Sequence, residues 1–140
     1  MSPTDSTRRR ERALALLERL QPGAPETVCA NLDAFDPQAV ELILGFAFDD
    51  VVSRDGIDLR TREMLTVAML AAMGTAPGQL DFHMRAALHA GVTRGKIVEI
   101  AYQVAVYAGV PAAMNTIASA RKAFEAGAPR ARETPERTPT

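Results

Sequence analysis

The chain has 140 residues, of which 47% are hydrophobic and 24% charged, and its formal net charge at pH 7 is −1. This composition is typical of one globular domain with a core of its own, and the near-zero charge argues against nucleic acid or an anionic membrane as a partner. Cys29 is the only cysteine, which excludes an intrachain disulfide, a paired-cysteine redox centre and a cysteine-rich metal site.

Helical periodicity begins near the N-terminus. Apolar residues recur on one face between about Thr7 and Leu20, which predicts an amphipathic helix that ends before the Pro/Gly-rich segment 22–25. A short irregular or helical piece is expected around residues 27–32. Asp36-Pro37 is then typical of a helix start, with Asp as the N-cap and Pro as the first helical residue. The helix that it opens should run to about Val52.

The next two helices carry the most unusual residues. Asp58 is suited to cap the first of these helices, which contains Glu63 and ends at segment 74–77. This helix is apolar almost all round. The following helix, from about residue 77 to residue 90, contains His83. It should end at Gly91, a natural left-handed terminator.

Two more helices complete the predicted fold. Thr93 should cap a helix that lasts until Gly109-Val110-Pro111, and a last helix should run from Pro111 to about Ala126. We see no strand-like alternation. We therefore expect a single all-α domain over residues 1–127 and a disordered tail over residues 128–140, where apolar residues are almost absent.

The sequence also suggests a location. No apolar stretch approaches the roughly 20 residues of a membrane span. The apolar run that follows the N-terminal arginines is interrupted by Glu18 and Arg19, too early for a signal peptide. We expect a cytoplasmic protein.

Glu63 and His83 stand out as candidate catalytic residues. Ionisable groups on such apolar helices are costly to bury unless they are paired. A carboxylate beside an imidazole is also a usual arrangement for proton transfer, since an imidazole exchanges protons readily near neutral pH. Two ordinary alternatives stay open: Glu63 can pair with Arg60 or Arg62, and His83 can be a structural core histidine.

Four motifs follow one another along the chain. They are Val-Ser-Arg at 52–54 with Gly56 and Leu-Arg-Thr-Arg at 59–62; the helix at 66–74; His-Met-Arg-Ala-Ala-Leu at 83–88 with Gly-Val-Thr-Arg at 91–94; and the segment 103–113 with Asn115. In this order and register they resemble the carboxymuconolactone decarboxylase family, specifically its γ-carboxymuconolactone decarboxylase branch, over residues 46–121.

The resemblance implies an alkyl hydroperoxidase D-like helical bundle of about six helices. It also implies a homo-oligomer, commonly a trimer or a hexamer, that needs no cofactor. The implied activity is that of a carboxy-lyase of aromatic-compound catabolism, similar to 4-carboxymuconolactone decarboxylase. The peroxidase relatives carry cysteines four and seven residues before the histidine. This chain has Gln79 and Ala76 there, so a thiol-based relay is excluded.

The implied substrate is a small unsaturated lactone or carboxylic acid. It loses a carboxylate while its own ring double bond and carbonyl accept the electrons, so no cofactor or metal is called for. In this hypothesis Glu63 orients the His83 imidazole, and His83 acts as the acid or as the donor to the enolate oxygen. A metal site is weakly supported, because His83 and His89 are six residues apart and do not share a helix face.

Four further residues are candidates for binding the substrate. Arg85 can hold a carboxylate, but two residues along a helix is a rotation of about 200° from His83. It serves either a site formed across a subunit interface or an interface ion pair. His89 stands where relatives often have asparagine. Tyr107 is either a pocket hydroxyl or a core aromatic residue, and Asn115 either contacts substrate or bridges helices.

Two alternatives to a decarboxylase stay open. An isomerase or cyclase can use the same pocket and the same acid–base pair. A non-catalytic oligomeric protein can keep the fold for binding alone. This chain has no tryptophan, although relatives usually carry tryptophans in the segment that corresponds to residues 46–52. The missing tryptophans, and the histidine at position 89 where relatives often have asparagine, leave the identity of the substrate open.

Overall fold

The structure, a computed structural model, describes residues 3–127, and the chain is helical through most of that range. The helices are α1 (Pro3–Leu20), α2 (Ala24–Phe35), η1 (Val40–Val52), α3 (Leu59–Met73), α4 (Pro77–His89), α5 (Arg94–Ala108) and α6 (Val110–Ala126). The described residues contain no strand, which confirms the all-α prediction, with seven helices rather than about six. None of these helices is long and apolar enough to cross a membrane. The predicted tail, residues 128–140, lies outside the described residues.

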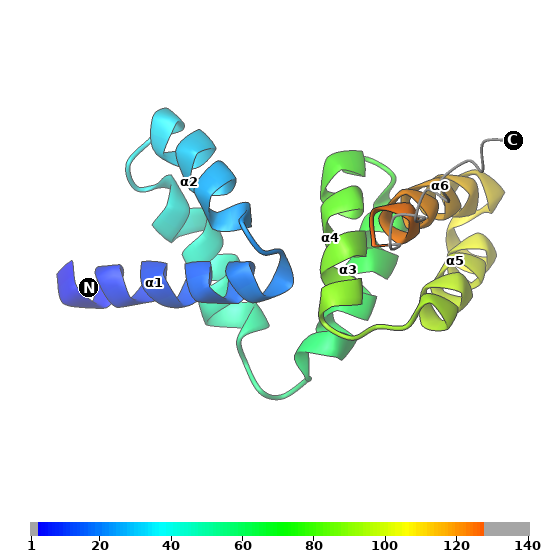
Figure 1. Cartoon of the computed structure of the whole chain (residues 1–140), viewed down its shortest axis with the longest axis horizontal. Helices are drawn as coiled ribbons and strands as arrows, with labels where there is room; N and C mark the ends of the chain where they lie inside the picture. The colour runs from blue at the N-terminus through cyan, green and yellow to red at the C-terminus, as the bar shows by residue number, and fades with distance from the viewer. Residues whose placement is uncertain (1–2, 128–140) are drawn as a thin grey trace, which may run out of the picture.

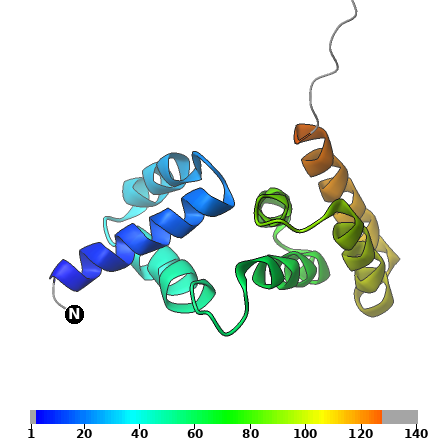
Figure 2. The same cartoon turned by 60° about the horizontal axis from the view of Figure 1, so that its bottom comes forward.

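The helices form two groups that meet at α4 (Figures 1 and 2). The N-terminal group consists of α1, α2 and η1, which share a buried cluster that includes Leu17, Leu20 and Phe48. The C-terminal group consists of α3 to α6, which share a second cluster around Met84 and Ile97. The fold therefore has two small cores rather than one large core.

Opposite sides of α4 belong to the two clusters. Leu80, Met84 and Ala87 face the C-terminal cluster, and Ala86 with Phe82 belongs to the N-terminal cluster. Residues three or four positions apart share a helix face, so these sets lie on different faces of α4. The helix that carries His83 is consequently in contact with both groups.

Several predicted helix ends are confirmed. Asp58 caps α3, because its Oδ1 accepts a hydrogen bond from the backbone N–H of Thr61 at 2.7 Å, and this contact lowers the pKa of the Asp58 carboxyl. Thr93 caps α5 in the same way, with its hydroxyl 3.2 Å from the N–H of Lys96. Gly91, with a φ of +95°, ends α4 in the left-handed region that glycine alone enters without strain.

The segment after α2 differs from its prediction. The structure has a π-helix over residues 40–52, not an α-helix that starts at Pro37. Asp36 closes α2 instead, and its carboxylate accepts a hydrogen bond from the N–H of Gln38 at 2.8 Å. Val40, Leu44 and Phe48 form the buried side at a spacing of four. That spacing suits the α-helical as well as the π-helical register, so the sequence pattern does not distinguish them.

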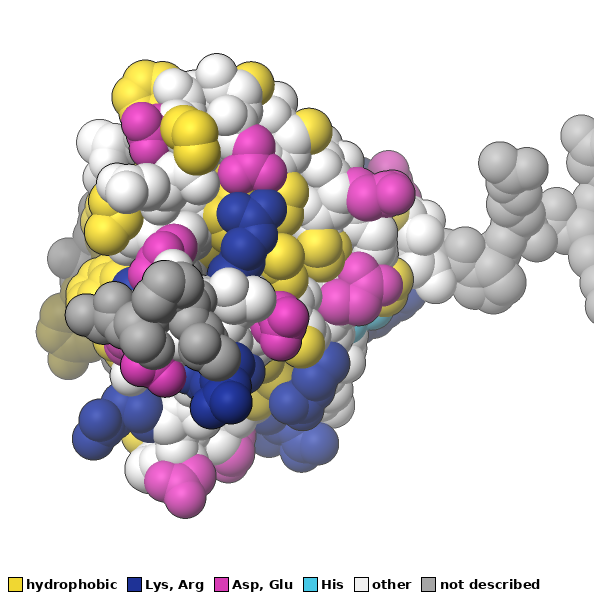
Figure 3. All heavy atoms as spheres, turned by 90° about the vertical axis from the view of Figure 1, so that its left-hand side faces the viewer, with side chains coloured by type: hydrophobic (Ala, Val, Ile, Leu, Met, Phe, Trp, Pro, Cys, Tyr) yellow, Lys and Arg dark blue, Asp and Glu magenta, His cyan; other side chains and the backbone are white. Residues whose placement is uncertain are grey.

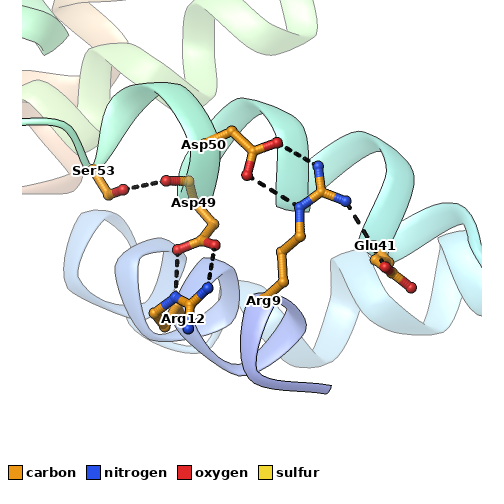
Figure 4. A network of polar contacts seen from close by, with 6 residues as sticks. All are labelled: Arg9, Arg12, Glu41, Asp49, Asp50 and Ser53. Atoms are coloured by element: carbon orange, nitrogen blue, oxygen red, sulfur yellow. Dashed lines mark hydrogen bonds and ion pairs between the residues drawn. The ribbon is translucent and has the colours of Figure 1, made fainter. Parts of the chain in front are cut away.

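Ion pairs join α1 to η1 (Figure 4). The Arg9 guanidinium donates two hydrogen bonds to Asp50 and lies 3.8 Å from Glu41. The Arg12 guanidinium donates two hydrogen bonds of 2.8 Å to Asp49, which lowers the pKa of the Asp49 carboxyl. Figure 3 shows basic and acidic side chains interspersed on this end of the molecule. Arginines near the start of the chain thus form ion pairs that hold α1 against η1.

Candidate functional site

Glu63 of α3 and His83 of α4 are in direct contact. Glu63 Oε2 lies 2.9 Å from His83 Nδ1, and the two side chains are 1% and 15% exposed. Arg62 instead donates to the backbone carbonyls of Ile57 and Arg54, and Arg60 lies against Gly91. The alternative in which Glu63 pairs with one of these arginines is therefore not the arrangement that the fold adopts.

The contact with Glu63 orients the His83 imidazole. When Nδ1 carries a proton, it donates a hydrogen bond to the carboxylate, which leaves Nε2 available to a ligand. The Phe82 ring meets the imidazole edge-on, with ring centroids 5.0 Å apart and an angle of 77° between the rings. Such a held imidazole can accept or donate a proton at one defined atom.

His83 lines a cavity of about 380 Å³ between the two helix groups. The cavity walls come from α1, α2 and η1 on one side and from α4 on the other. The residues that line it are Leu17, Val28, Leu32, Ile43, Leu44, Phe48, Gly78, Gln79, Phe82 and His83. Small-molecule sites commonly combine such an apolar wall with a few polar groups. We therefore take this cavity as the candidate active site.

Arg85 and His89 lie elsewhere. They line a second cavity, also of about 380 Å³, together with Gln21 and Leu88. His89 Nδ1 lies 2.9 Å from the backbone oxygen of Leu20, which ties the end of α4 to the end of α1. The expected rotation between His83 and Arg85 is present in the fold, so within one chain Arg85 does not line the cavity beside His83.

Tyr107 and Asn115 are also outside the candidate active site. Tyr107, at the end of α5, is 84% exposed. Asn115 of α6 lines a third cavity, of about 330 Å³, which also contains Asp81, Ser119 and Lys122. Roles for these two residues in substrate binding stay predictions. Neither lines the cavity that contains His83.

The sequence interpretation gave Gln79 no binding role, although the side chain lines the same cavity as His83. The signal that identifies it is the spacing, because residues i and i+4 of a helix share a face. A different kind of site is not evident: within residues 3–127, no three His, Cys, Asp or Glu side chains gather where they could hold a metal ion.

Comparison with known proteins identifies the family of the chain. Residues 37–122 match the model of the carboxymuconolactone decarboxylase family. The chain belongs to this family. The matched segment contains both Glu63 and His83, whereas Leu17, Val28 and Leu32 of the cavity precede it. Part of the cavity wall is therefore contributed by α1 and α2, outside the family match.

Two relatives of the chain have names that state an activity. The chain is 34% identical over 95 residues to a 4-carboxymuconolactone decarboxylase of Acinetobacter baylyi, which covers 68% of this chain and 70% of that protein. It is 31% identical over 97 residues to a nitrosuccinic acid decarboxylase of Metarhizium robertsii, which covers 69% of this chain and 67% of that protein. Both names describe decarboxylases, but with different substrates.

Proposed function

We propose that the protein is a decarboxylase that needs no cofactor and acts on a small unsaturated lactone or carboxylic acid. The observation that carries this proposal is the contact of 2.9 Å between buried Glu63 and His83, with His83 on the wall of an apolar cavity. Membership of the family and the decarboxylase names of two relatives support the reaction class. The fold alone would not select it, since one fold hosts several activities.

The proposed reaction uses the substrate as its own electron acceptor. The bond between the γ-carbon and its carboxylate breaks, and carbon dioxide leaves. The electron pair moves through the ring double bond to the lactone carbonyl, which becomes an enolate. One proton then returns to carbon, so that the net change is uptake of a proton and release of carbon dioxide.

His83 handles the proton and the developing charge in this proposal. Its Nε2 donates a hydrogen bond to the enolate oxygen or transfers the proton to carbon. Glu63 holds the ring in one orientation through Nδ1 and stabilises the imidazolium form. Glu63 thus acts through His83, as a positioning residue.

The family resemblance and the exposed apolar surface together support a homo-oligomer as the working form. Seven large side chains of α3, α5 and α6 are more than half exposed: Met69 at 58%, Met73 at 59%, Tyr102 at 61%, Val106 at 72%, Tyr107 at 84%, Val110 at 66% and Met114 at 60%. Apolar surface of this kind commonly marks a contact with another protein surface. In such an assembly Arg85 or Tyr107 of one subunit can approach the cavity of another. Light scattering after size-exclusion chromatography measures the mass directly.

The decisive experiment offers γ-carboxymuconolactone to the purified protein without added cofactor and follows release of carbon dioxide. His83→Ala should abolish turnover without changing the mass of the assembly. Free imidazole added to that variant should restore part of the rate, because it can occupy the space beside Glu63. Full activity in His83→Ala would remove this histidine from the mechanism. Conversion without carbon dioxide would favour the isomerase or cyclase, and binding without conversion would favour a binding protein.

A further inference from the structure

The second cavity, which we call the Arg85 cavity, is formed within one chain where three helices end. Arg85, Leu88 and His89 come from α4, Gln21 follows α1, and the last turn of α6 forms the remaining wall. The cavity has a volume of about 380 Å³ and shares no lining residue with the cavity beside His83. None of the described residues that line it is an acid, so its only full charge comes from Arg85 when His89 is neutral.

Arg85 supplies a cation that the fold leaves available. Its side chain is half-buried, yet within residues 3–127 it donates no hydrogen bond and has no acid within ion-pair distance. Asp81 lies one turn earlier on α4, but its carboxylate is held by Ser119 and Lys122 and lines a different cavity. A guanidinium binds a carboxylate through two parallel hydrogen bonds. A carboxylate is therefore a fitting partner for this arginine.

The other polar side chains of the Arg85 cavity lack hydrogen-bond donors to match. His89 Nδ1 lies 2.9 Å from the backbone oxygen of Leu20. A carbonyl oxygen can only accept, so Nδ1 carries the proton, and Nε2 of the neutral ring is an acceptor. Gln21 Oε1 is also an acceptor, and it is buried without a partner among the residues that the structure describes. A ligand that brings a donor as well as a carboxylate therefore suits this wall.

We propose that the Arg85 cavity is a second binding site, separate from the candidate active site, for a small hydroxycarboxylate with an apolar body. The carboxylate pairs with Arg85, the hydroxyl on the neighbouring carbon donates to His89 Nε2, and the apolar body lies against Leu88 and the alanines of α6. Residues four apart on a helix have Cβ atoms about 5–6 Å apart, so neighbouring groups of one small molecule can reach both Arg85 and His89. This site goes beyond the proposed function and does not depend on turnover.

The two histidines of the chain allow each cavity to be observed by itself, because His89 lines one cavity and His83 the other. We would titrate α-hydroxyisovalerate into the full chain and follow the ring nitrogens of both histidines by NMR, at about pH 8, where an ordinary imidazole is neutral. The His89 signals should shift and the His83 signals should not. Isovalerate, which lacks only the hydroxyl, and inorganic phosphate, which lacks the apolar body, should each bind about fivefold more weakly.

Variants test the role of Arg85 and assign the signals. Arg85→Gln removes the cation and should weaken binding of α-hydroxyisovalerate about tenfold, whereas Arg85→Lys keeps the charge without the planar fork and should lose less. Arg121→Gln is the matched control, because it removes the same charge from α6 but lines another cavity, so the affinity should stay as it is. His83→Ala removes one set of signals, which identifies those of His89, and should also leave the affinity unchanged. Circular dichroism checks that each variant is folded.

Each outcome has a distinct meaning. If the His89 signals do not move, or only those of His83 move, the Arg85 cavity is not the site. If both sets move together and His83→Ala weakens binding, one ligand bridges the cavities of two subunits, and a separate site is wrong. If isovalerate or phosphate binds as tightly as α-hydroxyisovalerate, the hydroxycarboxylate class is wrong. If Arg85→Gln binds like the unchanged protein, Arg85 is not the partner of the carboxylate. Failure of the protein to release carbon dioxide would refute the proposed function and leave this site standing.

Discussion

Removing His83 should destabilise the folded protein more than removing both members of the Glu63–His83 pair. Glu63 is 1% exposed, so His83→Leu leaves a carboxylate in the interior without its partner. Losing one member of a buried ion pair typically costs 3–5 kcal/mol, and because the His83 side chain is itself 15% exposed we expect the lower end, about 3 kcal/mol.

The reverse single change should be milder. Glu63→Leu removes the buried acid and leaves a neutral imidazole that retains some access to solvent, so we expect a cost of about 1.5 kcal/mol. The double change Glu63→Leu with His83→Leu replaces the pair by apolar side chains. It should also cost only about 1.5 kcal/mol, since a buried pair can often be exchanged for apolar residues at little cost. The coupling energy of this cycle is then about 3 kcal/mol.

Urea unfolding followed by circular dichroism measures all three variants, at neutral pH and one fixed protein concentration. For His83→Leu the midpoint should fall by about 1.5 M if the slope is about 2 kcal/mol per molar urea. His89→Leu is the control for loss of a histidine, because His89 Nδ1 contacts the backbone oxygen of Leu20 and no carboxylate is left behind. If the double variant costs the sum of the two single variants, the reasoning from the buried contact is refuted.

Three further predictions concern the supporting structure. Met84 is fully buried in the C-terminal cluster, so Met84→Ala should cost about 3 kcal/mol in the same urea assay. Thr93→Ala should cost about 1 kcal/mol in that assay, because the N–H of Lys96 in the first turn of α5 loses its acceptor. The Ser119 hydroxyl, with help from Lys122, lowers the pKa of the Asp81 carboxyl, so Ser119→Ala should move that pKa up towards its ordinary value, which a carbon-13 NMR titration measures. A carboxyl whose pKa is lowered by folding stabilises the folded protein at a pH above the ordinary carboxyl pKa. That contribution disappears as the pH falls through the pKa of the folded state. The loss of stability caused by Ser119→Ala should therefore shrink below about pH 4.

Much of the local structure is encoded in short patterns. The Asp58 and Thr93 caps and the Gly91 terminator depend on neighbouring residues only, so the sequence predicts where α3, α4 and α5 begin or end. The π-helix after residue 39 was not predictable in this way. Its buried residues recur every four positions, and that period fits more than one helix type.

The site was predictable in part. Apolar helices joined by a short turn place Glu63 and His83 on neighbouring elements, but their rotation towards one another is set by packing of α3 on α4. The helix geometry correctly separated Arg85 from His83. The cavity itself depends on how α1, α2 and η1 pack against α4. No local pattern carries that long-range information, so the position of Gln79 on the wall of this cavity is evident only in the folded chain.

Because the cavity lies between two small cores, binding of a ligand there should measurably raise the stability of the folded protein. A molecule seated there touches the N-terminal helices and α4 at once, so it adds contacts that hold the two halves together. Binding to the folded state alone raises the free energy of unfolding by about 2.7 kcal/mol when the ligand is at a hundred times its dissociation constant. A melting-temperature screen of small carboxylates can therefore find the substrate before any reaction product is known.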